Sequence, residues 1–265
     1  MKALNKYLAV ASVAARSNLA YFGEAASRLL FLAVILYIFM RLWKVTYTET
    51  GAAQLGGFSL EQMLWYLAVT ESIMLSAPRV ALLVDEDVRT GALTLQLVRP
   101  LAYPMYRLWT TMGERVVRFA VNGLAASVVA WVLVGPIPWN PLGLLALLVS
   151  LPLAFAIDFL GNFLIGLGAF WLEDTSGLVL IYSRITMILG GMLIPLEFFP
   201  DAVRPIMQAL PFASMVYGPA RAFVRPDLAE LTVLVVRQGL AVLAFSVLIG
   251  LVYRMALRRV FANGG

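Results

Sequence analysis

From Pro141 to Leu172 the sequence reads PLGLLALLVSLPLAFAIDFLGNFLIGLGAFWL, and Asp158 is its one charged residue. A helix needs about 20 mainly apolar residues to cross the hydrocarbon core of a bilayer, so this stretch predicts a membrane-spanning helix. At about 1.5 Å per residue it would be roughly 48 Å long, which exceeds a bilayer core. We therefore expect it to tilt, kink or protrude.

The composition of the whole chain indicates the same class of protein. Of its 265 residues, 62% are hydrophobic and 13% are charged, whereas soluble domains average about 45–50% apolar and about 25% charged residues. So few charged residues cannot cover a soluble surface, and a disordered chain would be poor in apolar residues. We expect an all-α polytopic membrane protein in which residues 1–265 form a single transmembrane domain.

Two residue types are absent, which excludes several kinds of site. The chain has no cysteine and no histidine. This removes disulfides, thiolate nucleophiles, the commonest general base and the commonest transition-metal ligand. The sequence also lacks the phosphate-binding patterns G-x-x-x-x-G-K-[ST] and G-x-G-x-x-G. We therefore expect no catalytic residue, no metal site and no cofactor site in this chain.

Apolar stretches bounded by charged or helix-breaking residues predict six membrane spans. Their predicted ranges are Leu29–Trp43, Leu60–Val84, Val116–Val134, Pro141–Leu172, Leu178–Phe198 and Leu231–Leu257.

The distribution of Lys and Arg between the flanks predicts the orientation of these spans. With the connections numbered alternately, twelve basic residues fall on the side of the two termini, five fall on the other side and three lie within spans. This asymmetry places both termini in the cytoplasm, which requires an even number of spans. The net charge of +5 belongs to these flanks. Because the basic residues are dispersed, no nucleic-acid partner is expected.

Residues 1–24 precede the first predicted span, and residues 195–230 form the connection between the fifth and the sixth. In the first of these segments, Leu4, Leu8 and Ala11 recur at helical spacing, which favours an uncleaved amphipathic helix on the membrane surface over a signal peptide. The second segment holds six prolines with apolar stretches between them. That pattern predicts short helices that re-enter the outer leaflet.

The cytoplasmic connection at residues 85–104 reads DEDVRTGALTLQLVRPLAYP. It contains an i,i+4 pair between Asp85 and Arg89, then a glycine, three alternate leucines and two prolines. A short amphipathic element bounded by helix breakers suits docking in the groove of a partner protein. It suits equally an interfacial helix that lies on the lipid headgroups.

Six stretches, in this order and spacing, resemble one family of proteins. They are NKYLAVASVAARSNLAY (5–21), GGFSLEQMLWYL (56–67), RTGALTLQLVRPLAYPMY (89–106), AFWLEDTSGL (169–178), GGMLIPLEFFP (190–200) and LPFASMVYGPARAF (210–223). In them the chain resembles the permeases of ATP-binding-cassette (ABC) type-2 exporters, and more narrowly a six-span bacterial subfamily. The resemblance covers nearly the whole chain.

The resemblance implies a fold and a set of partners. The fold has an N-terminal interfacial helix, six membrane helices, a coupling helix at about residues 85–98 and short external helices at about residues 200–224. The partners are a separate ATPase subunit, which would bind ATP and magnesium, and a second permease subunit, identical or different. The implied location is the bacterial inner membrane. The residues assigned to ATPase coupling are Asp85, Glu86, Asp87, Arg89, Gly91, Leu93, Leu97, Arg99 and Pro100.

Polar residues inside the predicted spans are candidates for the transport path. A charge at the centre of a span costs about 2.5–3.5 kcal/mol on insertion scales, so Glu71 and Asp158 need a reason to be there. They would either meet a cationic substrate, lie at a dimer interface or pair between helices with Arg184 or Arg237. We favour such structural roles, because paired charges are the usual solution inside bundles. Asn162 follows Asp158 by four residues and shares its helix face.

These observations favour the permease subunit of an ATP-driven exporter that performs no bond chemistry. The alternative is an ion- or proton-coupled transporter or channel that acts without an ATPase, with Glu71 and Asp158 as the relay. The absence of a visible inverted repeat argues against it. A membrane enzyme acting on lipid or peptide is least favoured, because no carboxylate pair is convincingly placed. Amphiphilic or cationic small molecules are the cargo that the resemblance implies.

Overall fold

The structure is a computed structural model that describes residues 2–19, 22–137 and 140–263. Within these ranges it is helical, with an isolated bridge between Leu55 and Phe58 as its only β-structure. The helices in chain order are α1 (Lys2–Leu19), α2 (Phe22–Thr50), α3 (Leu60–Leu75), α4 (Val80–Arg89), α5 (Ala92–Leu97), α6 (Tyr103–Val134), α7 (Pro141–Gly166), η1 (Leu167–Phe170), α8 (Ser176–Leu189), η2 (Leu196–Phe198), α9 (Arg204–Ala209), α10 (Pro211–Met215), α11 (Tyr217–Val224) and α12 (Leu228–Asn263).

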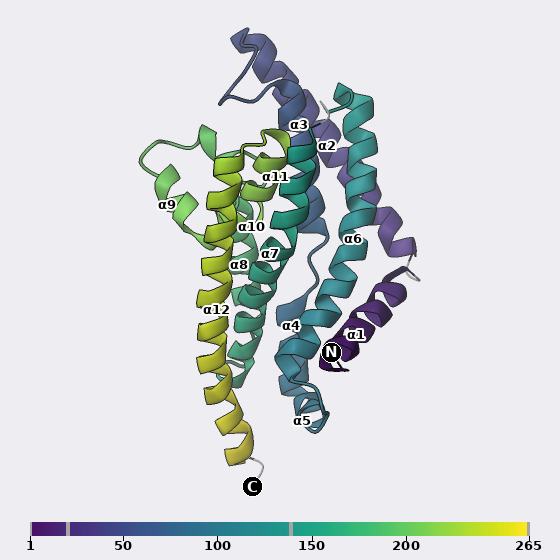
Figure 1. Ribbon diagram of the computed structural model, residues 1–265, viewed down its shortest axis with the longest axis vertical. Helices are drawn as coiled ribbons and strands as arrows, with labels where there is room; N and C mark the ends of the chain where they lie inside the picture. The colour runs from purple at the N-terminus through teal and green to yellow at the C-terminus, as the bar shows by residue number, and fades with distance from the viewer. Residues whose placement is uncertain (1, 20–21, 138–139, 264–265) are drawn as a thin grey trace.

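The long helices run roughly along the long axis of the molecule, and short helices gather toward its two ends (Figure 1). Helices α9, α10 and α11 lie toward one end, beside the first part of α12; we call this the α9–α11 end. Helices α4 and α5 lie toward the other, the α4–α5 end, where α12 finishes. Helix α1 packs on α6: the rings of Tyr7 and Trp109 stack with centroids 6.4 Å apart, and Gly113 leaves room for the backbone of Ala11.

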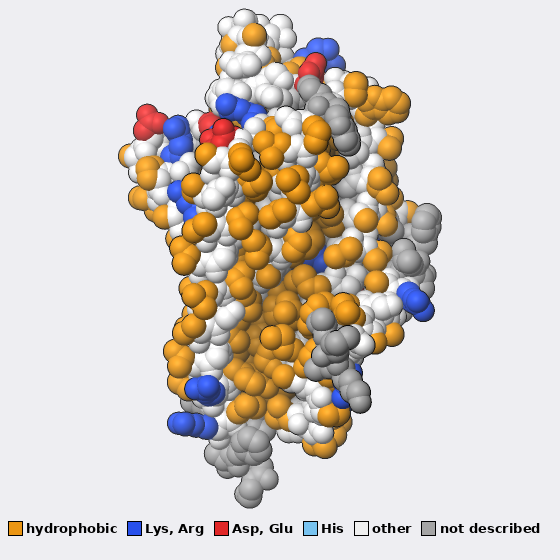
Figure 2. Space-filling model, viewed as in Figure 1, with side chains coloured by type: hydrophobic (Ala, Val, Ile, Leu, Met, Phe, Trp, Pro, Cys, Tyr) orange, Lys and Arg blue, Asp and Glu red, His pale blue; other side chains and the backbone are white. Residues whose placement is uncertain are grey.

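Among the described residues, five helical segments are long and apolar enough to cross a membrane. Many large apolar side chains on them are exposed, and Figure 2 shows a mainly hydrophobic face with charged side chains gathered toward its ends. Soluble monomers rarely expose so large an apolar surface. The chain is therefore a multi-pass membrane protein. The five segments are Ala26–Thr50, Leu60–Arg89, Tyr103–Val134, Pro141–Phe170 and Leu228–Arg258.

The predicted fifth span, Leu178–Phe198, is only partly helical. Helix α8 has 14 residues, so it is about 21 Å long, shorter than a hydrocarbon core of about 30 Å. Gly190 caps its end, and Gly191 follows with a φ of +65°. The structure thus has five long apolar segments and one short apolar helix, and six full-length spans are not confirmed.

Two prolines explain other differences from the predicted boundaries. Pro78 splits the predicted second span into α3 and α4, because proline has no N–H and disfavours helix in the residue before it. The sequence pattern treats Pro104 as a stop. It instead occupies the first turn of α6, where no N–H is needed, so the third span begins at Tyr103 rather than at Val116.

The prediction of one coupling helix over residues 85–98 is wrong. Asp85 to Arg89 form the end of α4, and α5 begins anew at Ala92. Gly91 between them has a φ of +73°, a conformation that glycine adopts at little cost and that commonly ends helices. Three short helices, α9 to α11, do lie within residues 195–230, where the prolines predict them.

Helix α3 lies at the centre of the packing and contacts α2, α6 and α11. A capping box begins it: Gln62 N donates to Ser59 Oγ at 3.2 Å, and Ser59 N donates to Gln62 Oε1 at 3.1 Å. Every residue from Met63 to Ile73 is buried. Glu71, in this stretch, is therefore enclosed by protein rather than exposed to lipid.

Candidate functional site

Two aspartates of α4 fasten the predicted coupling segment to the membrane helices. Asp87 is buried and accepts hydrogen bonds from the Tyr103 hydroxyl at 2.5 Å and from Arg107 Nε at 2.9 Å, both on α6. Asp85 accepts a hydrogen bond from Thr175 Oγ1 at 2.8 Å, at the start of α8. Hydrogen bonds to charged groups are about twice as strong as neutral ones, so α4 is held firmly against both helices.

Helix α5 is buried on one side and open on the other. Leu93 is 2% exposed and packs in a hydrophobic cluster with residues of α4, α6, α7 and α12. Leu95 is 71% exposed and Val98 is 86% exposed. Exposed apolar side chains on a short helix can dock against a partner protein or lie on lipid headgroups. We call Leu95 and Val98 the docking face; the charged residues Glu86, Arg89 and Arg99, nearby in the sequence, are exposed as well.

The predicted coupling residues therefore have different surroundings. Sequence reasoning missed Leu95 and Val98, because three alternate leucines do not reveal which one faces inward. It also missed Tyr103, Arg107 and Thr175, since these contacts join segments far apart in the chain. Of the predicted residues, Glu86, Arg89, Gly91, Arg99 and Pro100 are exposed, Asp85 and Leu97 are partly buried, and Asp87 and Leu93 are buried.

An ion pair between Arg115 and Asp158 joins α6 to α7 within the membrane-spanning part. Arg115 Nη1 contacts Asp158 Oδ2, and the two side chains are 2% and 12% exposed. The guanidinium carbon lies 4.2 Å from the ring centroid of Phe155, and Asn162 Nδ2 donates to Asp158 Oδ1 at 3.0 Å. Both charges therefore have partners beyond each other, which offsets part of the cost of burying them.

The predicted pairing of Asp158 or Glu71 with Arg184 or Arg237 is wrong. Arg184 lies on an exposed face of α8, and Arg237 on an exposed face of α12. The partner of Asp158 is Arg115, which the sequence pattern assigns to a cytoplasmic connection. The early start of α6 instead places Arg115 twelve residues into a membrane-spanning helix.

Glu71 is a buried carboxyl without a hydrogen-bond partner. It is 1% exposed, and neither carboxylate oxygen has a hydrogen bond to any residue that the structure describes. A buried polar group without a partner is costly, so such positions often have a functional role. Glu71 remains a candidate for the transport path, whereas the carboxylate of Asp158 already has Arg115 as its counter-ion.

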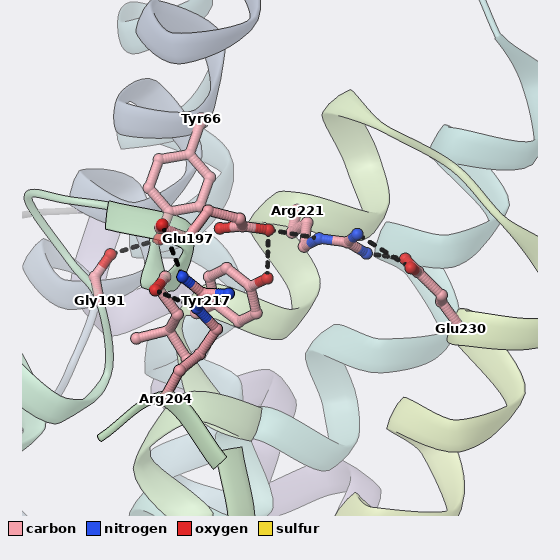
Figure 3. Close-up of polar contacts among 8 residues, drawn as sticks. Tyr66, Gly191, Glu197, Arg204, Tyr217, Arg221 and Glu230 are labelled. Carbon is pink, nitrogen blue, oxygen red and sulfur yellow. Dashed lines mark hydrogen bonds and ion pairs between the residues drawn. The ribbon is translucent and has the colours of Figure 1, made fainter. Parts of the chain in front are cut away.

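At the α9–α11 end, Glu197 is the centre of a polar network (Figure 3). Its Oε1 accepts hydrogen bonds from the Tyr217 hydroxyl at 2.6 Å and from Arg221 Nε at 2.9 Å. Arg221 also pairs with Glu230, near the start of α12. The network thus joins η2, α11 and α12, and sequence reasoning did not identify it because its members are distant in the chain.

Further hydrogen bonds fix the irregular backbone around this network. Arg204 donates to three backbone carbonyls within residues 196–199, at 3.0 to 3.2 Å. Tyr66 of α3 donates to the carbonyl of Gly191, just after α8. Burial raises the pKa of Tyr217 well above its ordinary value, so this hydroxyl stays neutral and donates to Glu197. Backbone carbonyls outside regular helices thus have hydrogen-bond partners at this end of the molecule.

Comparison with known proteins identifies a family of transport proteins. The model of a family described as "ABC-2 family transporter protein" matches residues 31–264, which is most of the chain. A search of curated proteins found no match to the chain.

Proposed function

This chain belongs to the ABC-2 family of transporter proteins, and from that membership we propose that it is the permease subunit of an ATP-driven exporter in a bacterial inner membrane. A separate ATPase subunit docks on the α4–α5 end from the cytoplasm, and a second permease subunit completes the substrate path. Closure of the ATPase moves α4 and α5 and shifts the permease between inward-facing and outward-facing states.

The docking face is the observation that supports this proposal most directly. Leu95 is exposed on the short helix α5 and Val98 directly after it, while the adjoining α4 is hydrogen-bonded through Asp85 to the start of α8 and through Asp87 to α6. A partner that pushed on this face would therefore displace two membrane helices together.

The proposal predicts that an ABC ATPase is encoded beside the gene of this chain and that the two proteins co-purify. Replacing Leu95 and Val98 by serine is expected to weaken the association at least about tenfold, because burying a Leu or Val side chain against a partner contributes about 1.5–3 kcal/mol. The matched control replaces Leu124 and Val128 by serine, which are 71% and 58% exposed on α6. Unaltered association of the docking-face variant would contradict the proposal.

A second candidate, ion- or proton-coupled transport without an ATPase, is favoured by one observation, the isolated carboxyl of Glu71. It predicts solute movement by the purified chain in vesicles, driven by a pH gradient and lost in Glu71→Gln. The permease proposal predicts no movement in these vesicles until the ATPase and ATP are added.

A further inference from the structure

A cavity of about 460 Å³ lies between η2, α9, α10, α11 and α12; we call it the polar cavity. Most of its charges are compensated: Arg221 pairs with two carboxylates, and Arg204 pairs with Asp201. Arg225 and Arg237 form no ion pair within residues 2–19, 22–137 and 140–263. The charged residues lining the cavity are Arg204, Arg221, Arg225, Arg237, Glu197, Asp227 and Glu230.

Arg237 has an unusual position for a charged residue. It lies on an exposed face of the apolar helix α12, among the exposed residues Val233, Val236 and Leu240. Its hydrogen bond to the carbonyl of Gln208 is long, at 3.5 Å. A charge on an exposed face of a membrane helix is costly unless it reaches water or a polar partner. Arg237 has no ion pair among the residues that the structure describes, so an anion from outside the chain would stabilise it there.

An apolar groove of about 420 Å³ adjoins the polar cavity, and Arg237 and Ser214 line both. Leu240, Ala244 and Leu248 line it at helical spacing along α12. From Arg237 to Leu248 the helix rises roughly 16 Å at about 1.5 Å per residue, close to one leaflet of a core about 30 Å thick. Figure 2 shows charged side chains over this end of α9 and α12, beside a hydrophobic flank.

From this charge and shape we propose that the polar cavity and the apolar groove together bind an anionic phospholipid of the bilayer. The phosphate accepts hydrogen bonds from Arg237, and an acyl chain occupies the groove toward Leu248. The planar guanidinium matches phosphate oxygens in geometry as well as charge. The site requires only a chain embedded in lipid, so it stands whether or not an ATPase docks at the opposite end.

The test is native mass spectrometry of the full-length chain released from nanodiscs. The nanodiscs contain phosphatidylglycerol and phosphatidylcholine with the same acyl chains. We expect the wild type to retain phosphatidylglycerol roughly tenfold better. Arg237→Gln removes this preference, Arg237→Lys keeps part of it, and Ala244→Trp, which fills the groove, lowers retention of both lipids. The control is Arg41→Gln, which removes an exposed arginine of α2 and leaves the preference unchanged.

Three results would overturn the proposal. In the first, Arg237→Gln retains phosphatidylglycerol as the wild type does. In the second, glycerol phosphate without acyl chains displaces the lipid fully, which would indicate a site for small anions. In the third, Ala244→Cys, the only thiol in its chain, cross-links to a second copy in the membrane, which would show that protein and not lipid covers the groove.

Discussion

At the scale of single residues, the Arg115–Asp158 ion pair is the interaction whose loss should cost most. Replacing Asp158 by leucine leaves a buried guanidinium without its counter-ion. We expect the free energy of unfolding to fall by about 3–5 kcal/mol, as it does when one partner of a buried pair is removed. Denaturant unfolding of the purified chain in detergent micelles measures the change.

A second pair on the same helix provides the control. Glu114 and Arg118 lie 3.4 Å apart, and their side chains are 26% and 21% exposed, so removing Glu114 should cost less than about 1 kcal/mol. The double variant Arg115→Met with Asp158→Leu should recover most of the stability, because apolar side chains then fill the site. Equal losses for Asp158→Leu and Glu114→Gln would refute this account.

Replacing Glu71 should raise the stability of the protein, in contrast to replacing Asp158. Its carboxyl is buried without a hydrogen bond, so Glu71→Met, of similar length, removes a cost rather than an interaction. We expect the free energy of unfolding to rise by about 1–3 kcal/mol in the same assay. A fall of more than about 1 kcal/mol would mean that the carboxyl has a partner in the assembled protein.

The polar residues show what local spacing can and cannot predict. The contact between Asp158 and Asn162 follows from their separation of four residues, and the structure has it. The partnership with Arg115 could not be predicted, because it depends on which helices are neighbours and on where α6 begins. The Glu197 network could not be predicted from the sequence for the same reason, because its members come from three separate elements.

At the scale of elements, Gly166 determines how closely α4 and α7 pack. A Cβ at this position would lie 2.6 Å from Val84 Cβ and 2.8 Å from the carbonyl oxygen of Ala81. Because the latter is a backbone atom, it can give way only if α4 shifts, and Gly166→Ala should lower the free energy of unfolding by about 1–3 kcal/mol. It should also loosen α4, and hence weaken ATPase association.

Gly168 supplies the matched control for this substitution. A Cβ there would meet its nearest neighbour at 3.6 Å, an ordinary van der Waals contact. Gly168→Ala should therefore be within about 1 kcal/mol of the wild type, measured by the same unfolding experiment. If both variants behaved alike, the close approach of α4 and α7 would not depend on Gly166.

The apolar stretches of the sequence identify the membrane helices but not their ends. Hydropathy is a property of the local sequence, so every predicted span contains helix. The ends depend on features with two meanings: Pro104 starts a helix, whereas Pro78 interrupts one. The shortness of α8 has a tertiary cause as well, because Gly191 after it accepts a hydrogen bond from Tyr66 of α3.

At the scale of the whole molecule, the two ends should face opposite sides of the membrane, and the orientation of α8 decides the number of crossings. Its 14 residues are too few to span a core of about 30 Å as a straight helix. The chain nevertheless passes from Thr175, bonded to α4, to Gly191, bonded to α3. We therefore expect α8 and the residues after it to complete a sixth crossing together.

Cysteine labelling tests this topology cleanly, because the natural chain has no thiol. In spheroplasts, a membrane-impermeant maleimide should label Asp201→Cys, whose side chain is 92% exposed at the α9–α11 end. Glu86→Cys on α4 and Asp174→Cys just before α8 are both at exposed positions. These two variants should react only after lysis. Ala126→Cys, at a position 1% exposed, should stay unlabelled throughout. Labelling of Asp174→Cys in intact spheroplasts would place both ends of α8 on the outer side of the membrane, which would contradict the predicted sixth crossing. An even number of crossings would then require another of the long helices to enter and leave the membrane on the same side.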